Sequence, residues 1–119
     1  MKLNAGQIVV VDWRDALPKE PNKGRPAVVV EDSDLFDDAY PNLILVPLTE
    51  DDRLAITDLS VAITPTPENG CTKDSRALAH HVTTTSKRRV APTSSRITDA
   101  QLTQIRRLIG ISIGLELRR

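Results

Sequence analysis

The 119-residue chain has little of what a disulfide-bonded, metal-bound or membrane-spanning protein requires. A single cysteine, Cys71, excludes an intramolecular disulfide, and together with two histidines it is too little for a zinc cluster. The longest uncharged apolar stretch, 109–115, is far shorter than a membrane span. Residues 1–4 lead straight into a strand-like segment, with no apolar signal region. We therefore expect a cytoplasmic protein with no membrane segment, metal or cofactor.

Aromatic residues and net charge are also scarce. Trp13, Phe36 and Tyr40 are the only aromatics, which argues against a platform on which several nucleic-acid bases stack. The formal net charge is +0, but residues 1–58 carry 12 acids and 6 bases, whereas residues 59–119 carry 4 acids and 10 bases. The difference, −6 against +6, predicts a bipolar surface with a basic face that could meet a polyanion. Charges scattered over the whole solvated surface are the alternative.

The apolar pattern predicts a mainly antiparallel β-protein that ends in one helix. Runs rich in β-branched or alternating apolar residues predict five or six strands, at 7–13, 26–30, 42–49, 59–63, 76–82 and near 89–91. The segment 14–25, with two prolines and a glycine, predicts a long exposed loop of the kind that is often functional. The length suits one domain, 1–119, around one hydrophobic core.

The helix at the end of the chain has the clearest boundary signals. Thr98 stands three residues before Gln101, as in a capping box, and Ile97 and Leu102 occupy the positions of a hydrophobic staple. Apolar residues then recur at helical spacing as far as Ile113. These signals predict an amphipathic helix that starts directly after Thr98.

Several segments, taken in order, resemble the MazF/PemK family of bacterial toxins. They are Gly6–Asp12, Gly24–Val30, Val46–Thr49, Asp74–Ala79 and Val82–Thr84, followed by the closing helix. No single motif is specific, so the resemblance depends on their order and spacing over nearly the whole chain. It implies an SH3-like, CcdB-type antiparallel barrel with a C-terminal helix that forms a homodimer. It also implies metal-independent cleavage of single-stranded RNA through the 2′-hydroxyl, and a cognate antitoxin protein that blocks the site.

The resemblance assigns candidate catalytic roles to three residues of the first half of the chain. Arg25 matches the family's catalytic arginine, and its planar, permanently charged guanidinium suits phosphate oxygens. Thr49 matches a catalytic threonine, whose hydroxyl can donate to a phosphate oxygen. Glu20 falls where family members carry a glutamate, although Pro21 replaces the glutamine that usually follows. The alternatives are a surface arginine, a strand-closing threonine and a solvated loop acid.

Two adjacent histidines are the main departure from the family pattern. His80 stands where the family commonly has an acid, and an imidazole with a reference pKa of about 6.5 exchanges a proton readily near neutral pH. If residues 76–82 form a strand, His80 shares a face with Leu78 and His81 points the other way. We select His80 as the proton-transfer residue, with a buried structural histidine as the alternative. The family's basic position nearby is Thr83 here, which removes one expected RNA contact.

Lys23, Arg76 and Lys87 are the remaining candidates for contacts to the RNA backbone, and each could be an ordinary surface charge. Two other functions are compatible with such a fold. One is a gyrase poison of the CcdB type, which acts by binding. A resemblance to such poisons would imply a tryptophan near the C-terminus, but the only tryptophan here is Trp13. A catalytically silent SH3-like interaction module would need an aromatic-lined groove, for which three aromatics are few.

Overall fold

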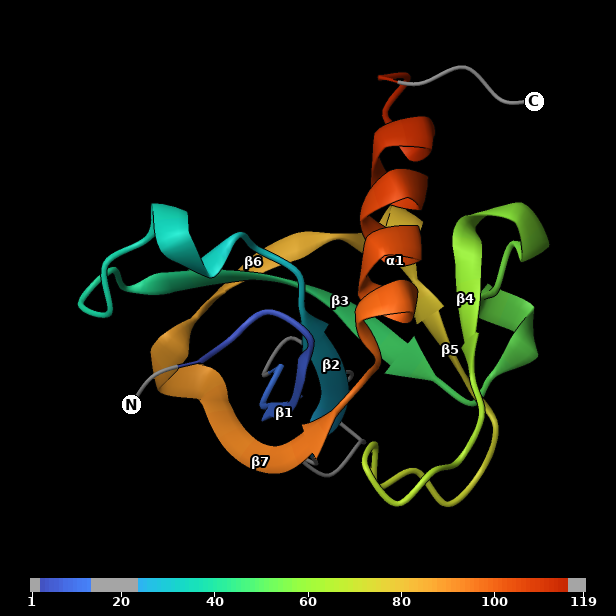
Figure 1. Cartoon of the computed structure of the whole chain (residues 1–119), viewed down its shortest axis with the longest axis horizontal. Helices are drawn as coiled ribbons and strands as arrows, with labels where there is room; N and C mark the ends of the chain where they lie inside the picture. The colour runs from blue at the N-terminus through green and yellow to red at the C-terminus, as the bar shows by residue number, and fades with distance from the viewer. Residues whose placement is uncertain (1–2, 14–23, 116–119) are drawn as a thin grey trace.

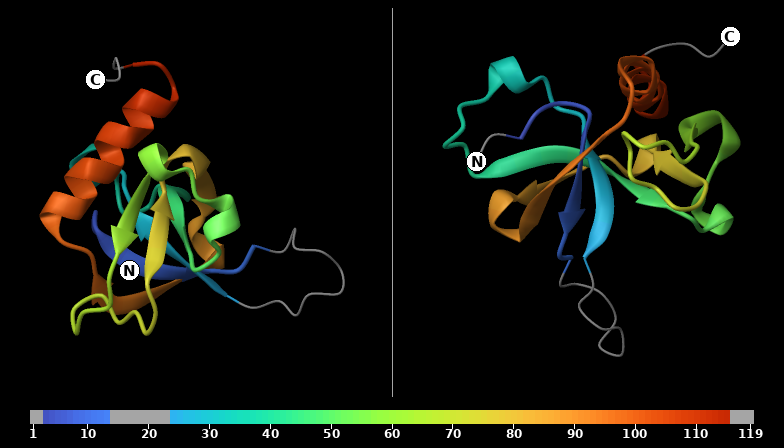
Figure 2. Two further views of the ribbon diagram at one scale, coloured as in Figure 1. Left: turned by 90° about the vertical axis from the view of Figure 1, so that its right-hand side faces the viewer. Right: turned by 60° about the horizontal axis from the view of Figure 1, so that its bottom comes forward.

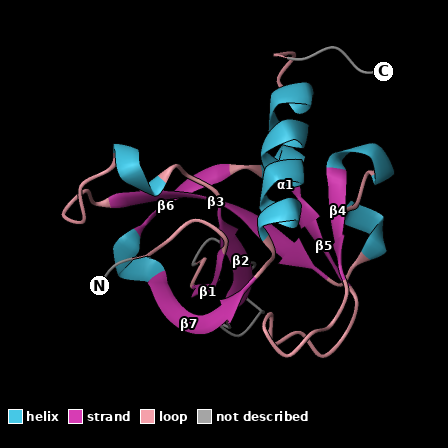
Figure 3. Cartoon of the chain, viewed as in Figure 1, coloured by secondary structure: helices cyan, strands magenta, loops and turns pink. Residues whose placement is uncertain are grey.

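A computed structural model describes residues 3–13 and 24–115 of the chain. Within these residues it contains a curled sheet and one long helix (Figures 1 and 3). The strands are β1 (Gln7–Val11), β2 (Arg25–Val29), β3 (Asn42–Thr49), β4 (Ser60–Ile63), β5 (Ser75–Leu78), β6 (Thr83–Ser86) and β7 (Val90–Arg96), and the helix is α1 (Asp99–Ser112). Short 3-10 turns are η1 (Ser33–Leu35), η2 (Asp52–Leu54), η3 (Thr57–Leu59), η4 (Ala79–His81) and η5 (Lys87–Arg89).

All strand pairs in the sheet are antiparallel, in the order β4-β5-β3-β2-β1-β7. β6 also pairs with β3, so one edge of β3 faces β2 and the other faces β6 and then β5. The predicted fold class, mainly antiparallel β with a C-terminal helix, is confirmed. Within the described strands the sheet curls without closing, because no pairing joins β4 to β7 at the two ends of the order.

The predicted strands at 7–13, 26–30, 42–49 and 59–63 are confirmed to within about two residues, and the one near 89–91 is the start of β7. The predicted strand 76–82 is wrong in its second half. β5 ends at Leu78, and the chain turns through η4 before β6 begins at Thr83. β6 was not predicted because its sequence, Thr-Thr-Thr-Ser, has no apolar alternation.

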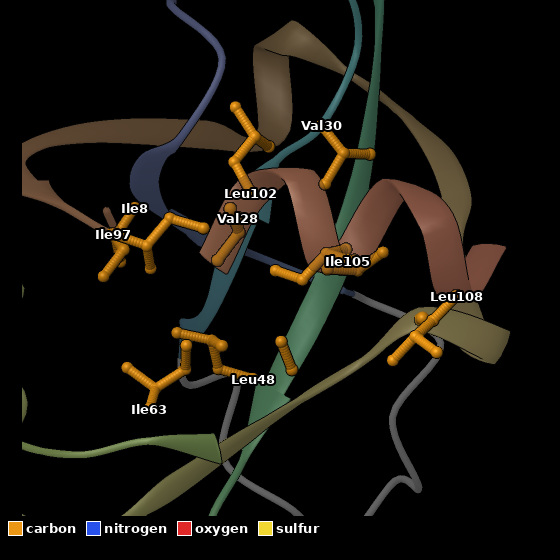
Figure 4. Packing of buried hydrophobic residues seen from close by; sticks show 12 residues of the cluster. Ile8, Val28, Val30, Leu48, Ile63, Ile97, Leu102, Ile105 and Leu108 are labelled. Carbon is orange, nitrogen blue, oxygen red and sulfur yellow. The ribbon is translucent and has the colours of Figure 1, made fainter. Parts of the chain in front are cut away.

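The sheet is buried on both faces, which explains the nearly continuous apolar runs of its first two strands. One face carries Ile8, Val28 and Val30, and it forms a core with the helix residues Leu102 and Ile105 (Figure 4). The residues between them on β1 and β2 point to the opposite face, because successive side chains of a strand alternate. That second cluster consists of Leu3, Val9, Val11, Ala27, Val29, Leu43, Leu45 and Val90, with Trp13 packed against it.

Helix α1 lies on the outside of the sheet and covers the first of these cores (Figures 2 and 4). The predicted capping box is confirmed: the backbone N–H of Gln101 donates to the Thr98 hydroxyl over 3.1 Å, and that of Thr98 donates to the Gln101 side chain over 2.9 Å. The guanidinium of Arg106 fastens the helix to the end of β2 by donating to the carbonyls of Val30 and Glu31 over 2.9 and 3.0 Å. None of the described helices is long and apolar enough to cross a membrane.

Candidate active site

Arg25 is held at the start of β2 by the hairpin-like pairing of β2 with β1. The register places Arg25 opposite Val11, at the last residue of β1. Gly24 comes directly before it, and a Cβ at that position would collide with the side chain of Val10. The glycine therefore allows the two strands to approach closely at the point where they present the arginine. Arg25 is exposed at the first residue of β2.

Thr49 is the last residue of β3, where it pairs with Arg76 of β5. The β2–β3 ladder pairs Ala27 with Pro47, and the same register extended by two residues would place Arg25 opposite Thr49. The Thr49 hydroxyl accepts the backbone N–H of Asp51 over 3.0 Å. That bond uses a lone pair and fixes the side chain, while the hydroxyl proton remains able to donate.

Arg25 and Thr49 line the same cavity, which has a volume of about 600 Å³. Its polar lining consists of Arg25, Thr49, Glu50, Asp51, Ser75 and His81. Its apolar lining consists of Trp13, Pro26, Pro47, Leu48, Leu54 and Leu78. The volume is in the range of cavities that bind small molecules. The lining combines the guanidinium of an arginine, a hydroxyl donor and an imidazole with apolar residues. This arrangement suits a phosphate ester with an attached ring.

The two acids of the cavity lie next to basic side chains. The Asp51 carboxylate receives Nε and Nη2 of Arg53 over 3.0 and 2.9 Å, and these hydrogen bonds lower the pKa of the Asp51 carboxyl. A carboxylate with a lowered pKa is a weaker base, so Asp51 is poorly suited to taking a proton from a hydroxyl. Glu50 lies 4.0 Å from Nζ of Lys73, and both of these side chains are exposed.

The structure places His81, and not His80, in the lining of the cavity. The chain leaves strand β5 at Leu78 and turns through η4, whose last residue is His81, and both Leu78 and His81 line the cavity. The expected direction of His80 assumed a strand through residue 82, and that premise is wrong, because β5 ends at Leu78. The two imidazole rings contact each other edge to face, with centroids 4.4 Å apart. Burial, and then the charge of His80, lower the pKa of His81.

His80 is less accessible than its neighbour. Its side chain is half-buried, and no described group forms a hydrogen bond with its buried Nδ1 atom. Turn η4, which carries it, packs against α1, β3 and β4. His80 is therefore not among the described residues that line the cavity, and its role in catalysis stays a prediction.

The other predicted site residues are not brought to this cavity in the described structure. Glu20 and Lys23 lie outside the described residues. Arg76 lines a separate cavity of about 210 Å³, and its Nε lies 3.3 Å from the carboxylate of Asp52. Lys87 is in η5, where its Nζ donates to the carbonyl of Asp38 over 3.2 Å. Whether Arg76 and Lys87 contact RNA stays a prediction.

Sequence reasoning missed Trp13, Glu50 and His81 as lining residues of the cavity. Glu50 had a usable signal, because it directly follows the candidate Thr49. His81 was singled out with His80 but not selected, since turn η4 does not show in the apolar pattern. Within residues 3–13 and 24–115, no three His, Cys, Asp or Glu side chains form a group that could hold a metal ion.

Comparisons with known proteins converge on one family. A model of the PemK-like, MazF-like toxins of type II toxin–antitoxin systems matches residues 4–113. No curated protein sequence matches the chain. An endoribonuclease in complex with its cognate antitoxin, from a mycobacterial species, superposes with a TM-score of 0.73 at 18% identity, covering 98% of this chain and 100% of that one.

Two structures from Deinococcus radiodurans show a similar likeness. MazF in one crystal form has a TM-score of 0.72 at 19% identity, covering 94% of this chain and 96% of that one. A MazE–MazF complex has a TM-score of 0.72 at 20% identity, with coverage of 96% and 98%. At these identities the structural likeness establishes a shared fold over nearly the full length of each chain.

Proposed function

The chain belongs to the family of PemK-like, MazF-like toxins of type II toxin–antitoxin systems, and on this premise we propose that it is an endoribonuclease that cuts single-stranded RNA. One observation carries the proposal. Arg25 and Thr49, which lie on different strands, line the same cavity of about 600 Å³. A cation and a hydroxyl donor side by side are the groups needed to stabilise a phosphate as negative charge builds on its oxygens.

The proposed reaction is an internal transesterification. The 2′-oxygen of a ribose attacks the adjacent phosphorus, the bond from phosphorus to the 5′-oxygen breaks, and the products are a 2′,3′-cyclic phosphate and a 5′-hydroxyl. Arg25 binds the non-bridging oxygens and stabilises the charge of the phosphorane, and Thr49 donates its hydroxyl proton to one of them. Glu20 and His80, the other predicted catalytic residues, stay candidates for proton transfer that rest on their positions in the sequence.

A metal ion is not needed for this chemistry as we propose it. Arg25 supplies a permanent positive charge at the phosphate, which is the role a metal ion otherwise plays in phosphoryl transfer. The Arg25 guanidinium also offers several N–H donors in a fixed plane, which a phosphate can accept in pairs. The proposal is therefore cleavage that continues when divalent cations are removed.

The partners proposed for the chain are an antitoxin protein and a second copy of itself. One of the similar structures is described as an endoribonuclease in complex with its cognate antitoxin, which supports the first. Exposed apolar side chains support the second: Ile113 and Leu115 at the end of α1 are 70% and 78% exposed. We propose a two-fold homodimer, to be checked by sedimentation at roughly tens of micromolar, where a monomer would contradict it.

The direct test of the proposed function is incubation of the purified protein with a mixed-sequence single-stranded RNA in excess EDTA. We expect discrete cleavage products that end in a cyclic phosphate. DNA of the same sequence, which lacks the 2′-hydroxyl, should stay intact. An Arg25→Ala protein purified in parallel guards against a contaminating nuclease. Cleavage that stops in EDTA and returns with magnesium or manganese would overturn the metal-independent mechanism.

A further inference from the structure

Turn η4 is an insertion in the strand pairing along one edge of β3. Ala77 of β5 pairs with Leu48, and Thr83 of β6 pairs with Leu45. Between these two pairs β3 advances by three residues, from 45 to 48, while the opposite chain advances by six, from 77 to 83. The three extra residues form η4 (Ala79–His81). Such an insertion re-aims a side chain that an unbroken strand would point elsewhere.

The residue of η4 that lines the cavity is His81. Leu78 is the cap residue before η4, and His81 is its last residue. Both line the cavity together with Arg25 and Thr49. His81 is exposed, so a ligand in the cavity can reach its ring.

We propose that His81 is the general base of the RNA cleavage reaction, a role that rests on the proposed endoribonuclease function. One of its ring nitrogens takes the proton of the 2′-hydroxyl as the 2′-oxygen forms its bond to phosphorus. The bond from phosphorus to the 5′-oxygen breaks, and the 5′-oxygen leaves with the electron pair and takes a proton from water. His81 then returns its proton to the solvent, so the net reaction consumes no water and needs no other reactant.

The surroundings of His81 favour the neutral imidazole that a base requires. Burial lowers its pKa, and repulsion from the adjacent His80 lowers it further. The charged groups that share the cavity are Arg25, Glu50 and Asp51. Strands β3 and β4, which pack against η4, contain no charged residue. Helix α1 also packs against η4, and its charged residues are Asp99, Arg106 and Arg107.

Glu50 is the rival base, because it is the second acid in the cavity and Asp51 is held by Arg53. Glu50 is exposed, and its carboxylate lies 4.0 Å from Nζ of Lys73. As a class, imidazoles have a reference pKa of about 6.5, closer to neutral pH than that of carboxyl groups, which favours an imidazole as general base. This rivalry decides the design of the experiment, since the two bases predict different pH–rate profiles.

The experiment measures the single-turnover cleavage rate of one single-stranded RNA from about pH 4 to 8 for the full chain and three variants. The unmodified protein should lose activity as acid protonates the base, with an apparent pKa below about 6.5. His81→Asn and His81→Gln should each lower the plateau rate by about 10²–10⁴ and remove this acidic limb. Glu50→Gln should keep the limb in place.

A fourth variant tests the environment of the base rather than the base itself. His80→Asn removes the neighbouring charge that lowers the pKa of His81, so the acidic limb should move to higher pH while cleavage continues. A merely structural His80 would not move the limb. Circular dichroism and thermal melting of every variant establish that each is folded before its rate is compared.

The inference is overturned if folded His81→Asn and His81→Gln keep the rate and profile of the unmodified protein, or if Glu50→Gln removes the limb. Either result leaves the endoribonuclease proposal intact as long as Arg25→Ala is inactive. If the unmodified protein cuts no RNA at all, the proposed function fails, and the role of His81 fails with it.

Discussion

The face of the sheet beneath α1 and the cavity at the ends of β2 and β3 are built from the same strands, but they use opposite kinds of side chain. Beneath the helix, Val28 and Ile105 are completely buried. At the cavity, Arg25 and His81 are exposed. Apolar burial provides most of the favourable free energy of folding, whereas an exposed charge contributes little to it. The first region should therefore govern stability and the second activity, with little overlap.

The largest expected effect is on stability, in the region beneath the helix. Ile105→Ala removes a fully buried side chain from the core and should lower the free energy of unfolding by about 2–5 kcal/mol. Chemical denaturation would measure the loss. Gln104→Ala, at an exposed position of the same helix, is the matched control and should change stability very little. A well-folded Ile105→Ala protein of unchanged stability would contradict the proposed division.

Arg25→Ala tests the other region. Removal of a charge-stabilising donor should lower the rate of RNA cleavage by roughly 10²–10³ while the melting temperature stays close to that of the parent. Arg25→Lys keeps the charge but loses the planar set of donors, so it should restore only part of the rate. If Arg25→Ala melts at a much lower temperature, the arginine is also structural and the two regions are not independent.

A smaller effect is expected at the start of α1. Thr98→Ala removes the hydroxyl that accepts the backbone N–H of Gln101 and should cost about 1 kcal/mol of stability. The helix covers the core and does not line the cavity, so RNA cleavage at a temperature well below melting should be unaffected. Thr103→Ala, exposed within the same helix, serves as the control. A large loss of activity in Thr98→Ala would show that the helix controls the site.

The smallest expected effect concerns the ion pair between Arg53 and Asp51 at the rim of the cavity. Both groups are solvated, so Arg53→Ala should leave the melting temperature at neutral pH nearly unchanged. The lowered pKa of Asp51 should rise toward its ordinary value, because the hydrogen bonds that cause the shift are lost. An NMR titration of the carboxyl measures this.

The sign of the linkage gives a second check on this pair. A lowered pKa in the folded protein contributes stability above the pKa of the unfolded chain, and the contribution disappears as the pH falls through the folded value. Any small difference in melting temperature between Arg53→Ala and the parent should therefore vanish in acid. A difference that grows in acid would contradict the assigned cause.

The local sequence was sufficient for the elements whose signals are short-range. Thr98 and Gln101 identify the start of α1 because a capping box needs only residues three positions apart. The strand at 42–49 was predicted with its observed bounds, because its β-branched and apolar residues continue without a break to Thr49. Arg25 and Thr49 were selected from their resemblance to a family, and the structure places both on one cavity.

What only the tertiary structure decided is the direction of the histidines. The sequence from 76 to 82 fits strand alternation. Nothing local in it indicates that, between two residue pairs, β3 advances by three residues while the opposite chain advances by six. The mismatch exists only once β5 and β6 are both paired with β3, and it is relieved by turn η4. The turn replaces the strand alternation on which the expected direction of His80 was based, and His81 is the histidine that lines the cavity. Local propensity fixed which side chains were available, and non-local pairing fixed which of them reaches the cavity.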